Sequence, residues 1–398
     1  MAKCLFLVFF ILSSVSGWGE EFVFKYREGD KYRILSTVKE DVYIDKKLNH
    51  RAEILNRIAV EVTGVKNGSG THRAVFQAAE NAEKIAAAGG FQWAREYESV
   101  FDRDELGHLS IDSKYFMPVV RDVPILPGRE LKAGDKWIAA GHEMHDFRDS
   151  FGIAEPYRIP FTANYTYLGI REWKGKPYPA FSVSYSILAR PPAVRGKIWP
   201  RRIEGSSDQI VYWEPELGQA AAYEEHFRML FELSDGRTVE YKGQAEAEII
   251  EAEYMDKEKI ASEIAAELER LAIPDATVRI TDEGIAISLE NIQFLADSAR
   301  LLPSEQRKLD QIAEILKKHS DRDIQVGGHT ALAGNAAGRE QLSLERAGAV
   351  ADYFLGKGVR TKDRIVIRGY GAERPIADNR TETGRQKNRR VEITILEN

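Results

Sequence analysis

The sequence is poor in cysteine and in long apolar runs, and it has no excess of positive charge. Its 398 residues include a single cysteine, Cys4, so no disulfide can form within the chain. After the first twenty residues, no apolar run reaches the roughly 20 residues that a membrane-spanning helix needs. The formal net charge is −6. This balance gives no reason to expect a nucleic acid or an anionic membrane surface as a partner, because either would favour a basic face.

The signatures of common catalytic and cofactor sites are also missing from the sequence. It has no phosphate loop ending in Gly-Lys-Ser/Thr, no Gly-x-Ser-x-Gly elbow and no convincing pair of catalytic carboxylates. The segment GHEMHD, residues 141–146, sets two histidines beside two acids, but its spacing is not the helical His-Glu-x-x-His pattern of zinc hydrolases. We place this segment in a loop. The sequence therefore predicts a protein that is not an enzyme and has no cofactor or metal site.

The first residues have the layout of a secretory signal peptide. Lys3 precedes an apolar run from Cys4 to Leu12, and small residues follow it. The run is too short to span a bilayer as a stable helix. We predict that residues 1–19 are a signal peptide, cut after Gly17 or Gly19, and that the mature protein contains no cysteine and resides in the periplasm or elsewhere in the cell envelope.

Residues 20–254 are predicted to form a large antiparallel β-rich domain. Apolar and polar residues alternate in RIAVEVTGV, FSVSYSILA and FRMLFEL, and turn sequences such as KNGSG and LSDGRT separate the segments. One face of each strand is then buried and the other solvated. The span is large for a single β-domain, so it admits a division into two subdomains near residues 150–160.

The rest of the chain predicts a linker helix over residues 255–274 and a second domain over 275–398. Ile264 and Leu268 recur at helical spacing in the linker. The second domain opens on a strand hairpin, and helices over 304–319 and 339–357 then alternate with three strands. Gly358 is placed to end the second of these helices. The order β-α-β-α-β-β predicts a mixed sheet with helices on one face, and the fold class of the chain is α+β.

Loops at one end of this mixed sheet are expected to converge, and ligands usually bind at such places. The segment GGHTALAGN, residues 327–335, presents His329 and Thr330 and is followed by a helix that carries Arg346. A guanidinium in that helix could reach back to the loop, where a fixed, charged fork suits a carboxylate ligand. From composition alone, Arg346 is equally well interpreted as a solvent-exposed charge on the helix surface.

A series of spaced motifs in residues 285–397 carries a family resemblance. The motifs are FLADSARLLP, GGHT followed by Gly334, LSLERAGAVADYF, and RGYGAERPIADNRTETGRQKNRRVEI. Together they resemble the OmpA-like C-terminal domain, the peptidoglycan-associating module of bacterial envelopes. The resemblance implies a non-covalent contact with the wall stem peptide, a structural role, and a place in the periplasm next to the wall. The outer membrane or another envelope protein is the further partner expected for the β-rich domain, which resembles no family that we recognise.

The resemblance also implies a ligand and a change in its site. In that family an aspartate directly after the His-Thr pair takes the ammonium of the stem-peptide diamino acid, and an arginine in the following helix takes its carboxylate. Here the arginine is Arg346, but the aspartate position is Ala331 and the usual asparagine eight residues on is Arg339. The acid after the first strand is kept as Asp297. A charge-assisted hydrogen bond contributes about 1.5 to 3 kcal/mol, so binding is expected to be weakened about tenfold to a hundredfold, or shifted to another diamino acid such as ornithine.

The expected peptidoglycan-contacting residues are Asp297, Gly328, His329, Thr330, Ala331, Arg339, Arg346, Arg385, Asn388 and Arg389. Each group has a structural alternative. His329 and Thr330 could shape the turn through hydrogen bonds, and Arg385, Asn388 and Arg389 could brace the last loop. For the whole protein, the alternative is a periplasmic carrier of a small apolar ligand or lipid, in which the OmpA-like fold has lost wall binding and serves as a scaffold.

Overall fold

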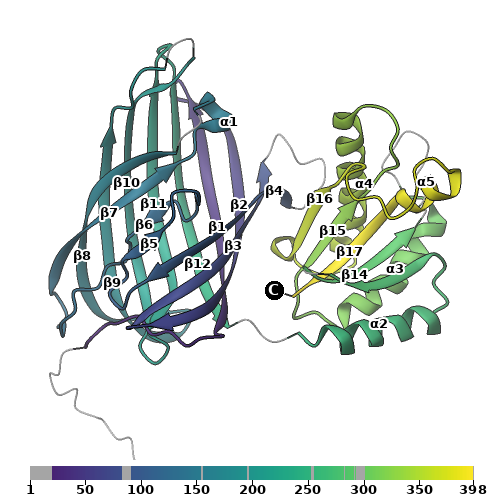
Figure 1. Ribbon diagram of the computed structural model, residues 1–398, viewed down its shortest axis with the longest axis horizontal. Coiled ribbons are helices and arrows are strands. Elements are labelled where there is room, and N and C mark those ends of the chain that lie inside the picture. The colour runs from purple at the N-terminus through teal and green to yellow at the C-terminus, as the bar shows by residue number, and fades with distance from the viewer. Residues whose placement is uncertain are drawn as a thin grey trace, which may run out of the picture.

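The computed structural model describes residues 20–82, 91–153, 156–194, 197–251, 255–281, 283–290, 292 and 301–397. Figure 1 shows a β-rich part, up to residue 251, beside a part in which helices cover a smaller sheet. The predictions for the signal peptide and for Asp297 lie outside the described residues. Within those residues, no helix combines the length and the apolar character needed to cross a membrane.

The β-rich part is one continuous antiparallel sheet that curves strongly on itself (Figure 1). Its strands follow the order β5-β4-β3-β2-β1-β12-β11-β10-β9-β8-β7-β6 across the sheet. The elements are β1 (Lys31–Ile44), β2 (Lys47–Lys66), β3 (Ser69–Ala82), β4 (Phe91–Arg103), β5 (Leu109–Ile111), β6 (Val120–Arg121), β7 (Lys136–His145), α1 (Arg148–Phe151), β8 (Tyr157–Trp173), β9 (Lys176–Ala189), β10 (Pro200–Glu214), β11 (Gln219–Leu233) and β12 (Thr238–Glu251). The strands on either side of residues 150–160, β7 and β8, pair with each other.

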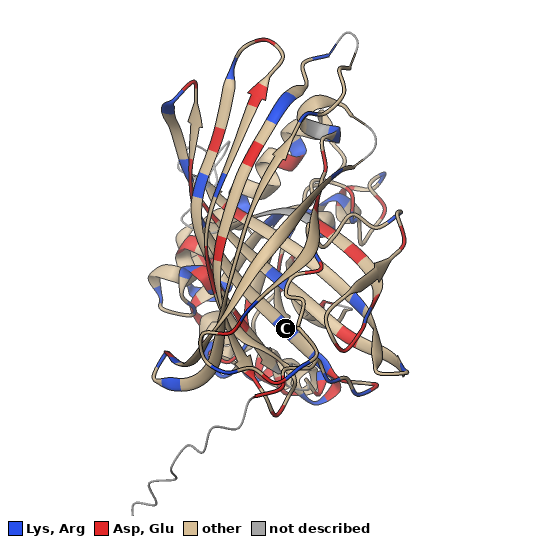
Figure 2. Ribbon diagram, turned by 90° about the vertical axis from the view of Figure 1, so that its left-hand side faces the viewer, with Lys and Arg blue, Asp and Glu red and all other residues tan. Residues whose placement is uncertain are grey.

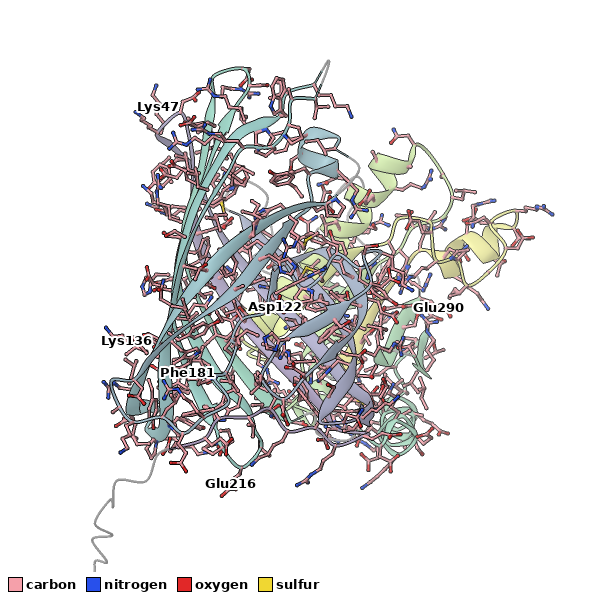
Figure 3. The ribbon with its side chains drawn as sticks, turned by 60° about the vertical axis from the view of Figure 1, so that its left-hand side comes forward. Lys47, Asp122, Lys136, Phe181, Glu216 and Glu290 are labelled. Atoms are coloured by element: carbon pink, nitrogen blue, oxygen red, sulfur yellow. The ribbon has the colours of Figure 1, made fainter. Side chains whose placement is uncertain are left out.

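Alternation along the strands sets which face of this sheet is buried. In β8, Ile159, Phe161, Ala163 and Tyr165 are buried, whereas the residues between them are exposed. Successive side chains of a strand point to opposite faces, so this pattern buries one face only. Aromatic rings fill much of that face, as in the stack of Phe161 on Tyr185 with ring centroids 3.9 Å apart. Figure 3 shows Phe181 of the same core among the strands, toward the end of the sheet that carries Glu216.

The buried face also carries carboxylates. Glu143 accepts a hydrogen bond from the hydroxyl of Tyr185 at 2.9 Å, and Glu225 accepts one from Ser207 at 2.6 Å. Burial raises the pKa of Glu225, and burial followed by repulsion from Glu80 raises the pKa of Glu40 to about 7. On the ribbon as a whole, acidic and basic residues are interspersed along the strands (Figure 2).

The second part is a mixed sheet with helices packed on one face, which is consistent with the predicted α+β class. The strand order is β13-β14-β17-β15-β16, and β15 and β16 are its parallel pair. The elements are α2 (Lys257–Arg270), β13 (Ala276–Ile280), β14 (Gly284–Glu290), α3 (Pro303–Lys317), β15 (Ile324–Gly328), α4 (Ala336–Gly356), the 3-10 turn η1 (Lys362–Arg364), β16 (Ile365–Gly369), α5 (Glu382–Asn388) and β17 (Arg390–Leu396). Apolar side chains of α2, α3 and α4 form one core with the covered face of the sheet.

The ends of the helices refine the sequence prediction. Helix α4 begins at Ala336, three residues before the predicted start, because the side chain of Asn335 accepts a hydrogen bond from the backbone N–H of Gly338 at 2.7 Å. Its predicted end is confirmed, since Gly358 follows the helix with φ +64°. The short helix α5 between β16 and β17 was not predicted.

The two parts meet along one sheet edge. Strand β4 pairs in parallel with β16 through Phe91 opposite Val366 and Gln92 opposite Ile367, and the two strands lie side by side in Figure 1. A small apolar cluster lies at this contact. Its members are Leu55, Ala79, Phe91 and Val366.

Candidate functional site

Four segments of the second part meet at one end of its sheet: the loop after β15, helix α4, the segment after β16 and the segment around α5. The position of Gly328 shows how closely they pack. Gly328 ends β15, and a Cβ at this position would lie 1.9 Å from the carbonyl oxygen of Ser343 in α4. Only glycine allows the helix to approach so closely. The hydroxyl of Ser343 in turn accepts a hydrogen bond from the backbone N–H of Gly371, which follows β16. The loop after β15 is therefore held against both α4 and the segment after β16.

His329 and Thr330 are packed into this end of the fold. His329 is 1% exposed and stacks on Tyr370 with ring centroids 4.8 Å apart. Its Nε2 lies 3.6 Å from an oxygen of Glu392, which is too long for a hydrogen bond, and burial lowers the pKa of the imidazole. The backbone N–H of Thr330 donates to the carbonyl of Gly371 at 2.8 Å. These contacts are those of residues that shape the turn.

Ala331 follows directly and is 6% exposed. Its carbonyl accepts a hydrogen bond from the N–H of Ala333, and the N–H of Leu332 donates to the side-chain oxygen of Asn379 at 3.0 Å. The backbone around the methyl group is therefore fixed by partners on both sides. A side chain introduced at position 331 would start from an ordered position.

Arg346 lies three residues after Ser343, hence on the same side of α4. It is half-buried, and burial, followed by the positive charge of Arg389, lowers its pKa. Arg389 comes from the other side of the site, between α5 and β17, and donates to Glu382 at 2.8 Å. The positive charge of Arg389 thus acts on Arg346 from another element, and an anion beside Arg346 would be stabilised.

Three further candidate residues hold the frame of the site. Arg339, in the first turn of α4, donates from Nη1 to the carbonyl oxygen of Gly334 at 2.5 Å. Arg385 donates to Glu382 and to backbone carbonyls in the turn before α5. Asn388 is 1% exposed and uses both ends of its amide, accepting from the N–H groups of residues 376 and 377 and donating to the carbonyl of residue 377.

Sequence reasoning missed Asn379. Its side-chain oxygen accepts from the N–H of Leu332 and from the amide of Asn388, each at 3.0 Å, so it joins the Ala331 loop to the segment before β17. The available signal was its place in a run rich in turn-forming residues, ADNRTETG. Such a run predicts a turn, but not which remote backbone group its side chains contact.

The prediction that GHEMHD lies in a loop was wrong. Residues 136–145 form β7, which pairs with β8 over its whole length, and this backbone pairing outweighs the polar composition. His142 and His145 consequently point to opposite faces of a strand. His142 lies 3.3 Å from Asp122 and His145 lies 2.7 Å from Glu143. In the described part of the chain, no three His, Cys, Asp or Glu side chains are grouped so that they could hold a metal ion.

The domain that carries this site matches a known family. Residues 293–389 match the model of the OmpA family. The C-terminal domain is an OmpA-family domain. No family model matches the N-terminal β-rich region.

Proteins similar to this chain share the OmpA-family region. The peptidoglycan-binding protein ArfA of Mycobacterium tuberculosis is 40% identical over 104 residues, which are 26% of this chain and 32% of ArfA. The probable lipoprotein YiaD of Escherichia coli is 36% identical over 121 residues, 30% of this chain and 55% of YiaD. A solved structure of the cell wall anchor of the T6SS from Pseudomonas aeruginosa is 27% identical, with a TM-score of 0.30, and covers 33% of this chain and 95% of that one. The likeness to ArfA therefore spans about a third of the length of that relative.

Proposed function

We propose that this chain is an exported cell-envelope protein whose OmpA-family domain associates non-covalently with peptidoglycan and links the wall to another envelope component. The family match and the name of ArfA as a peptidoglycan-binding protein support this proposal. The role is attachment rather than catalysis. The β-rich part supplies the surface for the second component.

The observation that carries the proposal is the placement of Arg346. Its guanidinium is half-buried, feels the positive charge of Arg389 and lies on a helix held against the Ala331 loop. A stem-peptide carboxylate would relieve the repulsion between the two arginines and gain a charge-assisted hydrogen bond. This pair of arginines is the proposed position of the ligand carboxylate.

The ammonium half of the ligand lacks its usual partner. Ala331 offers a methyl group where the family has a carboxylate, so we propose binding that is weaker than is usual for the family or shifted in its preference among stem-peptide diamino acids. The residues of the proposed site are the described residues Gly328, His329, Thr330, Ala331, Arg339, Arg346, Arg385, Asn388 and Arg389, together with Asp297. Of these, Arg346 touches the ligand, and the buried members position the loop.

Co-sedimentation with purified sacculi tests the proposal. The full mature chain is mixed at low salt with sacculi that contain diaminopimelate and, separately, ornithine. Arg346→Gln is expected to lower the bound fraction as if the dissociation constant rose about tenfold to a hundredfold, because one charge-assisted hydrogen bond is lost. Arg307→Gln, an exposed charge on α3, is the matched control. Equal retention of the two variants would show that Arg346 is not the anchor.

Ala331 favours a second candidate function, the carrier or scaffold in which the OmpA-family domain no longer binds the wall. It predicts that neither type of sacculus retains the chain and that lipid co-purifies with the β-rich part. Organic extraction of the purified protein followed by mass spectrometry detects such a lipid. Retention on sacculi together with an extract free of lipid excludes it.

A further inference from the structure

The sheet of the OmpA-family domain has a second face that α2, α3 and α4 do not cover. A cavity of about 320 Å³ opens on this face, a volume at the lower end of the range of about 300 to 1,000 Å³ found for small-molecule sites. Charged and amide side chains surround it. Those that matter for the argument are Arg279, Glu283, Gln325, Arg374, Arg390 and Glu392.

Arg390 lines this cavity and has an unfilled hydrogen-bonding position. It is 2% exposed, its Nε donates to Glu392 at 2.7 Å and one Nη donates to the carbonyl of Arg374 at 3.0 Å. The remaining terminal nitrogen, Nη1, is buried and has no hydrogen-bond partner within the described residues. A buried donor without a partner is costly, so an acceptor oxygen beside it is favoured.

The two carboxylates of the cavity are already engaged by the protein. Glu392 receives two hydrogen bonds from Arg279, at 2.6 and 2.7 Å, in addition to the one from Arg390. Burial by itself raises the pKa of Glu392, but His329 and Arg390 lower that pKa well below the usual range of a carboxyl. Glu283 lies 3.6 Å from Arg374. Glu392 is thus a fixed charge that orients arginines rather than a vacant acceptor.

The guanidinium of Arg374 is held at the rim of the cavity. It lies 4.2 Å from the centre of the Tyr370 ring, and its side chain is 49% exposed. Stacking on an aromatic ring restricts a guanidinium while leaving its N–H edge able to donate. Three arginines and two carboxylates line the cavity, which leaves one positive charge in excess.

We propose that this cavity binds a small hydroxylated monocarboxylate, such as an acidic sugar. Arg374 and the free nitrogen of Arg390 take the carboxylate. Neutral polar side chains, Gln325 and Thr394 among them, face the hydroxyl groups. A monoanion matches the excess of one positive charge, whereas a phosphate dianion would leave a buried negative charge uncompensated. None of these residues belongs to the site around Ala331 and Arg346, so the proposal stands apart from wall binding by that loop.

Isothermal titration of the full mature chain with sodium glucuronate tests the assignment. Glucose is the neutral probe and glucose 6-phosphate the dianionic one. Saturable binding of glucuronate, with weaker binding of both other probes, is expected. Equal binding of glucose would overturn the role of the arginines, and tighter binding of glucose 6-phosphate would overturn the choice of a carboxylate. Absence of saturable glucuronate binding would overturn the site itself.

Two variants locate the binding without disturbing buried Arg390. Arg374→Gln is expected to weaken glucuronate binding about tenfold to a hundredfold, because it removes one charge-assisted hydrogen bond. Arg279→Gln removes the excess positive charge and is expected to weaken binding about fivefold. Arg380→Gln, an exposed arginine of the same loop that does not line the cavity, is the matched control. If all three variants bind like the wild type, glucuronate binds elsewhere and the proposal fails.

Discussion

Arg57 and Asp323 are 266 residues apart in the chain and form a buried ion pair, with Arg57 Nε 3.0 Å from Asp323 Oδ2. Their side chains are 9% and 7% exposed. Arg57 also donates a hydrogen bond to the carbonyl oxygen of Asp363. Asp323 also accepts a hydrogen bond from Nε of Arg364 at 2.7 Å. The β-rich part is therefore joined to the OmpA-family domain by a polar network as well as by the pairing of β4 with β16.

Replacing Arg57 by leucine is expected to loosen this junction. Breaking a buried ion pair usually costs about 3 to 5 kcal/mol, but Arg364 still neutralises Asp323, so we expect a loss of about 1 to 3 kcal/mol in the free energy of unfolding. Urea denaturation measures the loss. Arg51→Leu breaks an exposed pair with Asp41 and should cost less than about 1 kcal/mol. Equal losses in the two variants would show that burial does not strengthen the Arg57 pair.

Restoring a carboxylate at position 331 is expected to tighten wall binding. In Ala331→Asp the new side chain begins from a fixed backbone and can pair with the ligand ammonium, so the dissociation constant for diaminopimelate sacculi should fall about tenfold to a hundredfold. Ala333→Asp adds the same charge two residues away, at an exposed position. A gain shared by both variants would point to general electrostatics instead of a specific contact.

The close approach of β15 to α4 predicts a sharp difference between two glycines. Gly328→Ala places a methyl group against the carbonyl of Ser343 and should lower the free energy of unfolding by about 1 to 3 kcal/mol. Gly356→Ala has open space around its Cβ and lies in the last turn of α4, where alanine is the better helix former by up to about 1 kcal/mol. Thermal melts of the two variants should therefore shift in opposite directions.

Glu40 is expected to make the stability of the β-rich part depend on pH. Its pKa is raised in the folded protein, from an ordinary value of 4.5 to about 7, by burial and then by repulsion from Glu80. The folded state therefore holds a proton that the unfolded state releases, and stability is lost as the pH rises through this interval. Glu40→Gln removes the effect and should raise the free energy of unfolding by about 3 kcal/mol at pH 8, with little change at pH 4.

Urea titrations at both pH values check this prediction. Glu246→Gln is the control, because it replaces a carboxyl by an amide at an exposed position of β12. A stabilisation by Glu40→Gln that is equal at the two pH values would mean that the gain comes from packing and not from the proton.

Local patterns were sufficient to predict the strands and the three longer helices, α2, α3 and α4, of the second part, but not the short helix α5. The spacing that buries Ile264 and Leu268, and the glycine after α4, act within a few residues and can be read directly from the sequence. The motifs around Arg346 also located the end of the sheet where the candidate site forms. The sequence could not predict the contacts between segments that are distant along the chain.

The contact of Asn379 with Leu332 and the ion pair of Arg57 with Asp323 depend on how segments 47 and 266 residues apart are brought together. The residues next to Asn379, Leu332, Arg57 and Asp323 in the sequence do not indicate these contacts. The same holds for GHEMHD, whose composition is that of a loop although five of its six residues pair with β8. Sheet pairing is decided between segments, so a single polar segment is a poor guide to it.

The pairing of β4 with β16 also affects what happens to each part when it is separated from the other. Strand β16 is the last strand of its sheet, and β4 occupies some of the backbone groups that this edge would otherwise present to solvent. An uncovered edge recruits strands from neighbouring molecules. Proteolytic release of the OmpA-family domain would expose this part of the edge, which β4 covers in the intact chain.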